Sequence, residues 1–112
     1  MKYALLIMDT EAAFTLTEEQ DKAWYAEIMA WYDNLQGSGR LVPGGERLQS
    51  AKTAKTIRAG GVTDGPFMEA KEVLGGFSLV AAETIDEAVE LARTWPGVDR
   101  GLITIEVRPV AD

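Results

Sequence analysis

The motif Asp64-Gly65-Pro66-Phe67 and the residues after it carry side chains whose types could do chemistry. Asp64 could act as a general base or hold a ligand. An aspartate before Gly-Pro also commonly accepts hydrogen bonds from its own backbone and caps the turn, and we favour this structural role. Lys71 could act as a base if burial lowered its pKa, whereas Glu72 is interpreted as part of a solvated face. Asp64, Phe67 and Lys71 are therefore candidate ligand-binding residues, and Asp64 and Lys71 are also candidate catalytic residues.

A second candidate pair, Glu106 and Arg108, lies in the alternating segment near the end of the chain. Strand alternation places three apolar side chains on one face and this charged pair on the other. If the apolar face packs on helices, the pair projects into a barrel or dimer face, where an unpaired charge costs several kcal/mol. Glu106 and Arg108 then either pair across an interface or hold a polar ligand, and the two alternatives are about equally supported. Tyr3 and Glu46 could approach the same space, and Glu106 is a third candidate catalytic residue.

The chain has neither cysteine nor histidine among its 112 residues. Zinc, haem and non-haem iron sites almost always use imidazole or thiolate ligands, so we expect no metal and no cofactor. The formal net charge of −7 repels phosphate backbones and anionic lipid, which argues against nucleic-acid and membrane binding. No stretch reaches membrane-spanning length and the start of the chain lacks the features of a signal peptide, so we expect a cytoplasmic protein.

Two helices have clear start signals. Thr17 and Gln20 have the form of a capping box, and Thr84 with Glu87 repeats it before a second helix that Pro96-Gly97 ends. The apolar stripe of the first helix, at helical spacing, is Trp24, Ile28, Trp31 and Leu35. Because the tryptophans lie on stripes that face the core, a core role is favoured over a stacking platform.

Strands are predicted around these helices. Residues 3–8 are apolar on both faces, as in a central strand that is covered on each side. The other predicted elements are a short strand at 40–42 that Pro43-Gly44-Gly45 breaks, a hairpin at 53–58 and 62–63, a helical turn at 68–74 that Gly75-Gly76 ends, and strands at 77–82 and 102–107.

This order of elements predicts one α+β domain over residues 1–112. It matches the ferredoxin-like, split βαβ plan, in which an antiparallel sheet carries two main helices on one face, here with an inserted hairpin plus short helix. Such a plan leaves the other sheet face bare, although the first strand is apolar on both sides. We therefore expect a homodimer that covers this face, since two-fold pairs are the commonest assemblies.

The motif and its flanks resemble the signature of the YCII-related, DGPF-domain family. The matching segments are residues 2–7, 44–46, 64–67, 69–72, 75–77 and 106–109. The resemblance covers essentially the whole chain and implies a dimeric α+β barrel. Some members look like small enzymes that use a histidine–aspartate pair, and others occur beside sigma factors, which suggests a regulatory or ligand-sensing role. Because this chain has no histidine, the histidine–aspartate chemistry does not carry over.

Two classes of function fit these residues. The first is a small-molecule-binding domain, regulatory in some settings, whose pocket lies between the sheet and the segment from Asp64 to Glu72. The second is a cofactor-independent enzyme for proton transfer, isomerisation or elimination, in which Asp64 or Glu106 is the base and Lys71 or Arg108 stabilises negative charge. We favour the binding domain. A domain that works by association with a partner protein is a third class, and it would need a large exposed apolar patch.

Overall fold

The structure, a computed structural model, describes residues 1–67 and 72–111. Its elements follow the chain in the order β1 (Lys2–Asp9), η1 (Glu11–Thr15), α1 (Glu18–Gly37), β2 (Leu41–Arg47), η2 (Ala51–Thr53), β3 (Lys55–Arg58), β4 (Gly61–Asp64), β5 (Val73–Ala81), α2 (Ile85–Arg93) and β6 (Ile103–Pro109). Among the described residues, no helix is long and apolar enough to cross a membrane.

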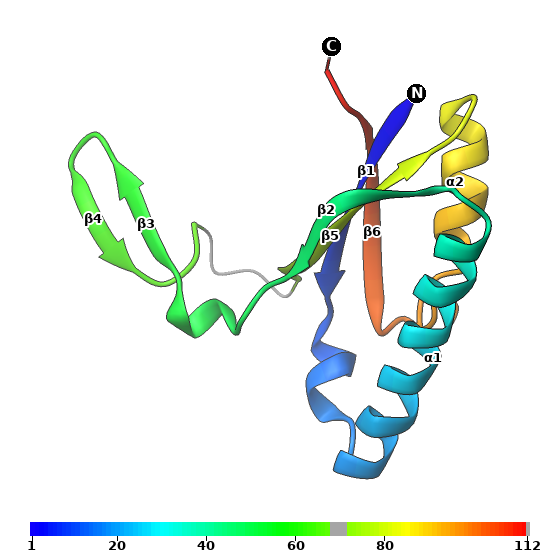
Figure 1. Ribbon diagram of the computed structural model, residues 1–112. Helices are drawn as coiled ribbons and strands as arrows, with labels where there is room; N and C mark the ends of the chain where they lie inside the picture. The colour runs from blue at the N-terminus through cyan, green and yellow to red at the C-terminus, as the bar shows by residue number, and fades with distance from the viewer. Residues whose placement is uncertain (68–71, 112) are drawn as a thin grey trace.

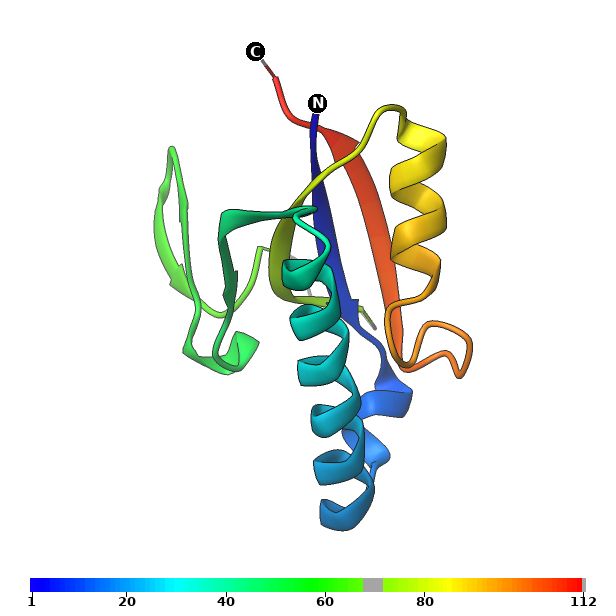
Figure 2. The same ribbon diagram turned by 45° about the vertical axis from the view of Figure 1, so that its right-hand side comes forward.

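The main sheet has the strand order β2-β5-β1-β6, and each neighbouring pair is antiparallel (Figure 1). β5 lies between β1 and β2, and β1 lies between β5 and β6, so the two βαβ units are interleaved. Both helices lie on the same side of this sheet, as Figure 2 shows from a second direction. The α+β, ferredoxin-like plan predicted from the sequence is therefore confirmed.

The core lies between the sheet and the helices. Tyr3, Leu5 and Ile7 on β1 point toward the helices and are almost completely buried. Trp24 and Trp95 are also buried, which confirms the core role predicted for them. The Trp24 indole donates a hydrogen bond to the Pro96 carbonyl at 2.8 Å and thereby satisfies its buried polar group.

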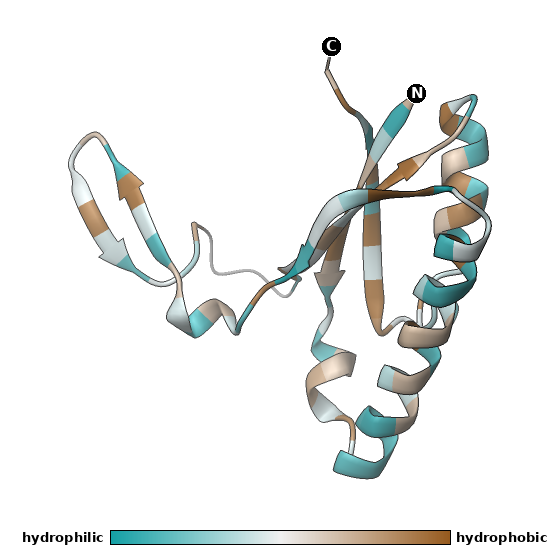
Figure 3. Cartoon of the chain, in the orientation of Figure 1, coloured by the Kyte–Doolittle hydropathy of each residue, from teal (hydrophilic) through white to brown (hydrophobic). Residues whose placement is uncertain are grey.

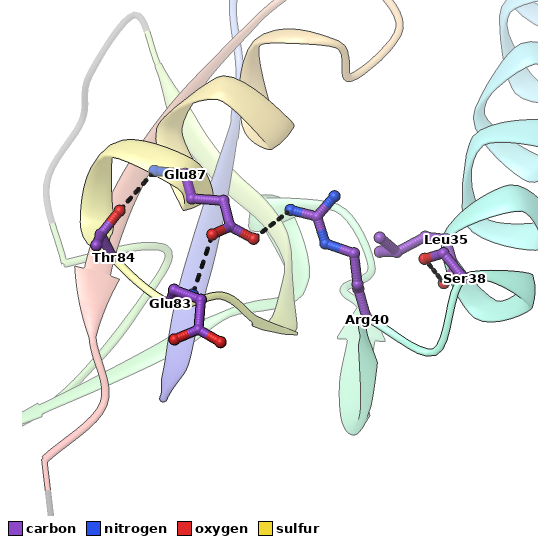
Figure 4. A network of polar contacts seen from close by, with 6 residues as sticks. All are labelled: Leu35, Ser38, Arg40, Glu83, Thr84 and Glu87. Atoms are coloured by element: carbon purple, nitrogen blue, oxygen red, sulfur yellow. Dashed lines mark hydrogen bonds and ion pairs between the residues drawn. The ribbon is translucent and has the colours of Figure 1, made fainter.

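Both predicted helix starts are present. Thr17 accepts a hydrogen bond from the Gln20 backbone, and the Gln20 side chain accepts one from the Thr17 backbone, which completes a capping box. At α2, Thr84 accepts from the Glu87 backbone, but the Glu87 carboxylate accepts from the Glu83 backbone and from Arg40 (Figure 4). The Arg40 contact ties the start of β2 to the helix that follows β5.

Two strands differ from the sequence prediction. Pro43-Gly44-Gly45 does not break a strand: β2 continues to Arg47 with an irregular register between Val42 and Glu46. β2 is an edge strand, where a proline without an N–H is tolerated. β5 begins at Val73, so Gly75-Gly76 lies inside a strand and does not end a helix at Leu74. Residues 68–71 of the predicted helical turn lie outside the described residues.

The inserted hairpin forms a separate two-stranded sheet of β3 and β4. We call residues 50–67, which contain it, the arm. The hairpin of the arm stands clear of the main sheet in Figures 1 and 2, whereas η2 lies close to β5. The radius of gyration of the chain is 15.1 Å, whereas a compact chain of this length has about 13 Å. The arm therefore makes the single chain less compact than an ordinary domain.

Candidate functional site

The sheet side that faces away from both helices, here called the open face, carries an apolar centre between polar edges. Residues in register across an antiparallel sheet share a face. Two rows of side chains cross the open face in this way. In order from β2 to β6, the first row is Val42, Leu79, Ala4 and Arg108. The second row is Glu46, Phe77, Leu6 and Glu106.

The apolar members of these rows are only partly buried in a single chain. Figure 3 shows the hydrophobic colouring on the strands of the sheet. Glu46 and Glu106 lie at opposite ends of one row, on strands whose backbones are three strand spacings, or about 14 Å, apart. An apolar floor with polar groups at its edges suits either a small ligand or a protein interface.

Glu106 and Arg108 lie on the open face, on the side that strand alternation predicts. Arg108 Nε is 3.4 Å from Glu106 Oε2, and the two side chains are 69% and 54% exposed, respectively. An exposed pair of this kind contributes about 0–1 kcal/mol. In one chain the pair is therefore available to a ligand or a partner, and the two alternatives of the sequence analysis stay open.

Thr104 and Glu72 extend the polar edge of the open face. The Thr104 hydroxyl donates to Glu72 Oε1 at 3.1 Å. Thr104 lies opposite Met8 of β1, which in turn lies opposite Leu74 of β5, so this contact spans the open face near one end of the sheet. Glu72 is exposed, as its solvated interpretation requires, but it also has this defined partner.

Tyr3 does not approach the space beside Glu106 and Arg108, contrary to the expectation from the sequence. Its side chain is 2% exposed and packs in the core on the helix side of the sheet. The reason is the period of the strand: the β1 residues opposite Glu106 and Arg108 are Leu6 and Ala4, and Tyr3 has the other parity.

Asp64 and Phe67 lie on the arm and not on the main sheet. The Asp64 carboxylate accepts a hydrogen bond from Lys55 Nζ at 2.6 Å, so it forms an ion pair across the hairpin, and the described residues include no backbone donor to it of the kind that the expected cap would use. Phe67 is 68% exposed and lies under the Arg58 guanidinium, 5.0 Å from the ring centroid. Lys71 lies outside the described residues.

Neither of two hollows among the described residues is the expected pocket between the sheet and the segment from Asp64 to Glu72. One, of about 520 Å³, lies between α1 and the loop after α2 and is lined by Glu27, Trp95 and Arg100. The other, of about 330 Å³, is lined by residues 47–50. Among all the residues that the structure describes, no three acidic side chains lie close enough together to form a metal site.

Asp9 is a candidate that the sequence analysis missed. Burial raises the pKa of its carboxyl above the usual 3.8; Arg47 acts against this shift and Asp21 adds to it. The carboxylate occupies the space that a side chain at Gly75 would fill, so Gly75 makes room for it. The sequence shows an aspartate at the end of an apolar strand and, far along the chain, the glycine pair Gly75-Gly76. Neither feature reveals that the aspartate is partly buried.

We expect Asp9→Asn to stabilise the protein at neutral pH and to have little effect below about pH 3.8. The folded state binds the Asp9 proton more tightly than the unfolded state, so stability falls as the pH rises from 3.8 through the raised pKa. Asp9→Asn has no carboxyl at this position, so its stability does not fall in this way as the pH rises. Denaturation curves from pH 3 to pH 8 measure it, with Asp33→Asn on the exposed part of α1 as the control. A constant difference between Asp9→Asn and wild type at all pH values would contradict the assignment.

Comparison with known proteins agrees with the motif. A family model described as the YCII-related domain matches residues 1–112. An uncharacterized protein of Rhizobium meliloti (strain 1021) is 33% identical over 116 residues, which cover 99% of this chain and 93% of that protein.

A solved structure has a similar fold. It is 5-chloro-2-hydroxyhydroquinone dehydrochlorinase from Burkholderia phenoliruptrix AC1100 in complex with 2,5-dihydroxybenzoquinone, with a TM-score of 0.63 and 18% identity. The match covers 99% of this chain and 94% of that one. At this identity the likeness shows the fold alone.

Proposed function

Because the chain belongs to the YCII-related domain family, we propose that it is a homodimeric small-molecule-binding domain whose ligand lies on the open face. The observation that carries the proposal is the pattern of that face, an apolar floor from Leu6, Phe77 and Leu79 with Glu46, Glu106 and Arg108 at its edges. A ligand with an apolar body and polar or ionised substituents fits this pattern.

The surface area of a single chain supports the dimer. The chain exposes 7844 Å², whereas a folded monomer of 12.2 kDa exposes about 6,100 Å². The excess of about 1,700 Å² is more than the roughly 800 Å² that each partner buries in a standard interface. A second copy is the partner that the proposal names, and residues 1–112 act in it as one domain. The absence of cysteine fits a cytoplasmic location, which is also part of the proposal.

The first test is the mass of the protein by light scattering at micromolar concentration, where we expect a dimer. Ligand binding is then tested by thermal shift and native mass spectrometry with millimolar small aromatic and quinone probes that carry hydroxyl or carboxyl groups. The first probe is 2,5-dihydroxybenzoquinone, because the solved structure of similar fold binds it. A monomeric mass, or the absence of any binder from the panel, would contradict the proposal.

Site variants make the same test specific. Arg108→Gln removes the cation at the edge of the open face, and we expect it to reduce the affinity for an anionic probe by about tenfold, the equivalent of one charge-assisted hydrogen bond of roughly 1.4 kcal/mol. Arg93→Gln is the matched control, since Arg93 lies on α2 with its side chain 71% exposed. Equal affinities in the two variants would place the ligand elsewhere.

Proton transfer is a second candidate function, at a position separate from the open face, since Asp9 lies on the helix side of β1, and the environment of Asp9 favours it. A general base needs partial burial and a raised pKa, and Asp9 has both. Asp64 and Glu106, in contrast, are largely exposed in a single chain. A carbon-13 NMR titration of the Asp9 carboxyl, with and without a bound probe, tests the candidate. It fails if the Asp9 pKa is not raised or does not respond to the probe.

A further inference from the structure

The arm has the surface of a segment that packs on another molecule. Ile57, Val62 and Phe67 are 78%, 61% and 68% exposed, respectively. Figure 3 shows hydrophobic positions on both strands of the arm, away from the main sheet. An isolated two-stranded hairpin is marginally stable in water, because it buries too little apolar surface. Among the residues that the structure describes, the hairpin of the arm therefore lacks a partner surface.

One face of the arm combines an apolar pair with an ion pair. Ile57 lies opposite Val62, and Lys55 lies opposite Asp64. Because residues two apart on a strand share a face, all four side chains are on the same side of the hairpin. The polar contacts of the arm among described residues run within it, as in the bond from the Thr56 hydroxyl to the Gly65 carbonyl. This face is thus free to meet another surface.

The charge of the arm favours a second copy of this chain as that surface. Three of the 11 basic residues but only one of the 18 acidic residues lie in the arm, which leaves eight basic and 17 acidic residues for the rest of the chain. A basic arm is attracted to the acidic remainder of another copy. The excess exposed area of the single chain is large enough for such a contact in addition to a standard interface.

We infer that the arm of each subunit packs against the β6 side of the open face of the other subunit. Both surfaces carry one acid and one base that are exposed in a single chain: Lys55 with Asp64 on the arm, and Glu106 with Arg108 on β6. Across the contact, Lys55 meets the partner's Glu106 and Asp64 meets the partner's Arg108. Four alternating charges form a network, which is worth more than two isolated exposed pairs.

The ligand site is then composite. Asp64 and Phe67, which the sequence motif singles out, reach the open face from the partner subunit. This arrangement explains why one chain does not bring the arm residues together with Glu106 and Arg108. The inference rests on the proposed dimer and open-face site, and it adds which segment of the second copy completes that site.

Cysteine cross-linking tests the contact cleanly, because the chain has no cysteine of its own. Val62→Cys is mixed with isotope-labelled Thr104→Cys, and a short bis-maleimide is added. We expect a cross-linked heterodimer in at least tenfold higher yield than in a control mixture where Val89→Cys replaces Thr104→Cys. Val89 lies on the exposed side of α2. Circular dichroism of each variant checks that it is folded.

The outcomes separate this inference from the proposed dimer. A dimeric mass with equal yields for positions 104 and 89 would overturn the arm contact and leave the dimer standing. A monomeric mass would overturn both. Cross-linking only within one chain, in a Val62→Cys/Thr104→Cys double variant, would show that the arm folds back on its own sheet and would also overturn the inference.

Charge reversal gives an independent measurement. Asp64→Arg and Arg108→Asp should each raise the dimer dissociation constant, and the double variant should recover most of the loss, because the reversed charges again attract each other. Additive losses in the double variant would contradict the pairing of Asp64 with the partner's Arg108. Asp33→Arg with Arg93→Asp serves as the control pair, since both residues lie on exposed helix positions.

Discussion

Leu5→Ala is expected to lower the free energy of unfolding by about 2–5 kcal/mol. Leu5 is completely buried on the helix side of β1, in the cluster that contains Leu35 of α1 and Ala88 of α2. Removing its side chain leaves a cavity that the sheet and both helices cannot fill, because the flanking strands β5 and β6 fix the position of β1. Urea denaturation measures the effect.

Val89→Ala is the control for this loss, because Val89 is 36% exposed on α2 and its truncation should change stability by no more than about 0.5 kcal/mol. Similar losses in Leu5→Ala and Val89→Ala would contradict the two-layer core. The neighbouring variant Leu6→Ala separates the two sides of the sheet. Leu6 faces the open side, so in a dimer its truncation should raise the dimer dissociation constant more than Leu5→Ala does.

Strand alternation and helix capping were readable in the sequence because they depend on local chemistry. The capping box at Thr17 and Gln20 needs only two side chains three residues apart, and it is present. The face of Glu106 and Arg108 followed from the period of two. The same period does not place Tyr3, because residues 3–8 are apolar on both faces and only the register of β1 with β6 puts Tyr3 on the helix side.

The other differences arise from tertiary context. Gly75-Gly76 has the composition of a helix stop, yet pairing with β1 and β2 draws both glycines into β5. The environment of Asp9 depends on the space at Gly75 and on the charge of Arg47, both of which are distant in the sequence. The position of the arm relative to the sheet depends on contacts that no local pattern encodes. Residues that the motif groups together in sequence, Asp64 and Phe67 with Glu72, therefore need not share a site in one chain.

Gly45→Ala is expected to destabilise the protein by about 1–3 kcal/mol and to abolish the ligand-induced thermal shift. A Cβ at position 45 would lie 2.6 Å from the Phe77 carbonyl oxygen and 2.9 Å from the Ser78 Cα. These are backbone atoms of β5, so they cannot rotate away as a side chain would. β2 must therefore move away from β5, and it takes Glu46, the acidic edge of the open face, with it.

Gly37→Ala is the matched control for this close approach. A Cβ there meets nothing within 4 Å, and alanine favours the end of α1 by up to about 1 kcal/mol over glycine. Thermal and urea denaturation of both variants, followed by titration with the same probe, measure the two effects. If Gly45→Ala were as stable as Gly37→Ala and still bound the probe, the spacing between β2 and β5 would not position the site. If Gly45→Ala loses binding at a temperature where it is still folded, then the loss does not come from fold stability alone. The close approach of β2 to β5 would then be what positions Glu46 for contact with a ligand.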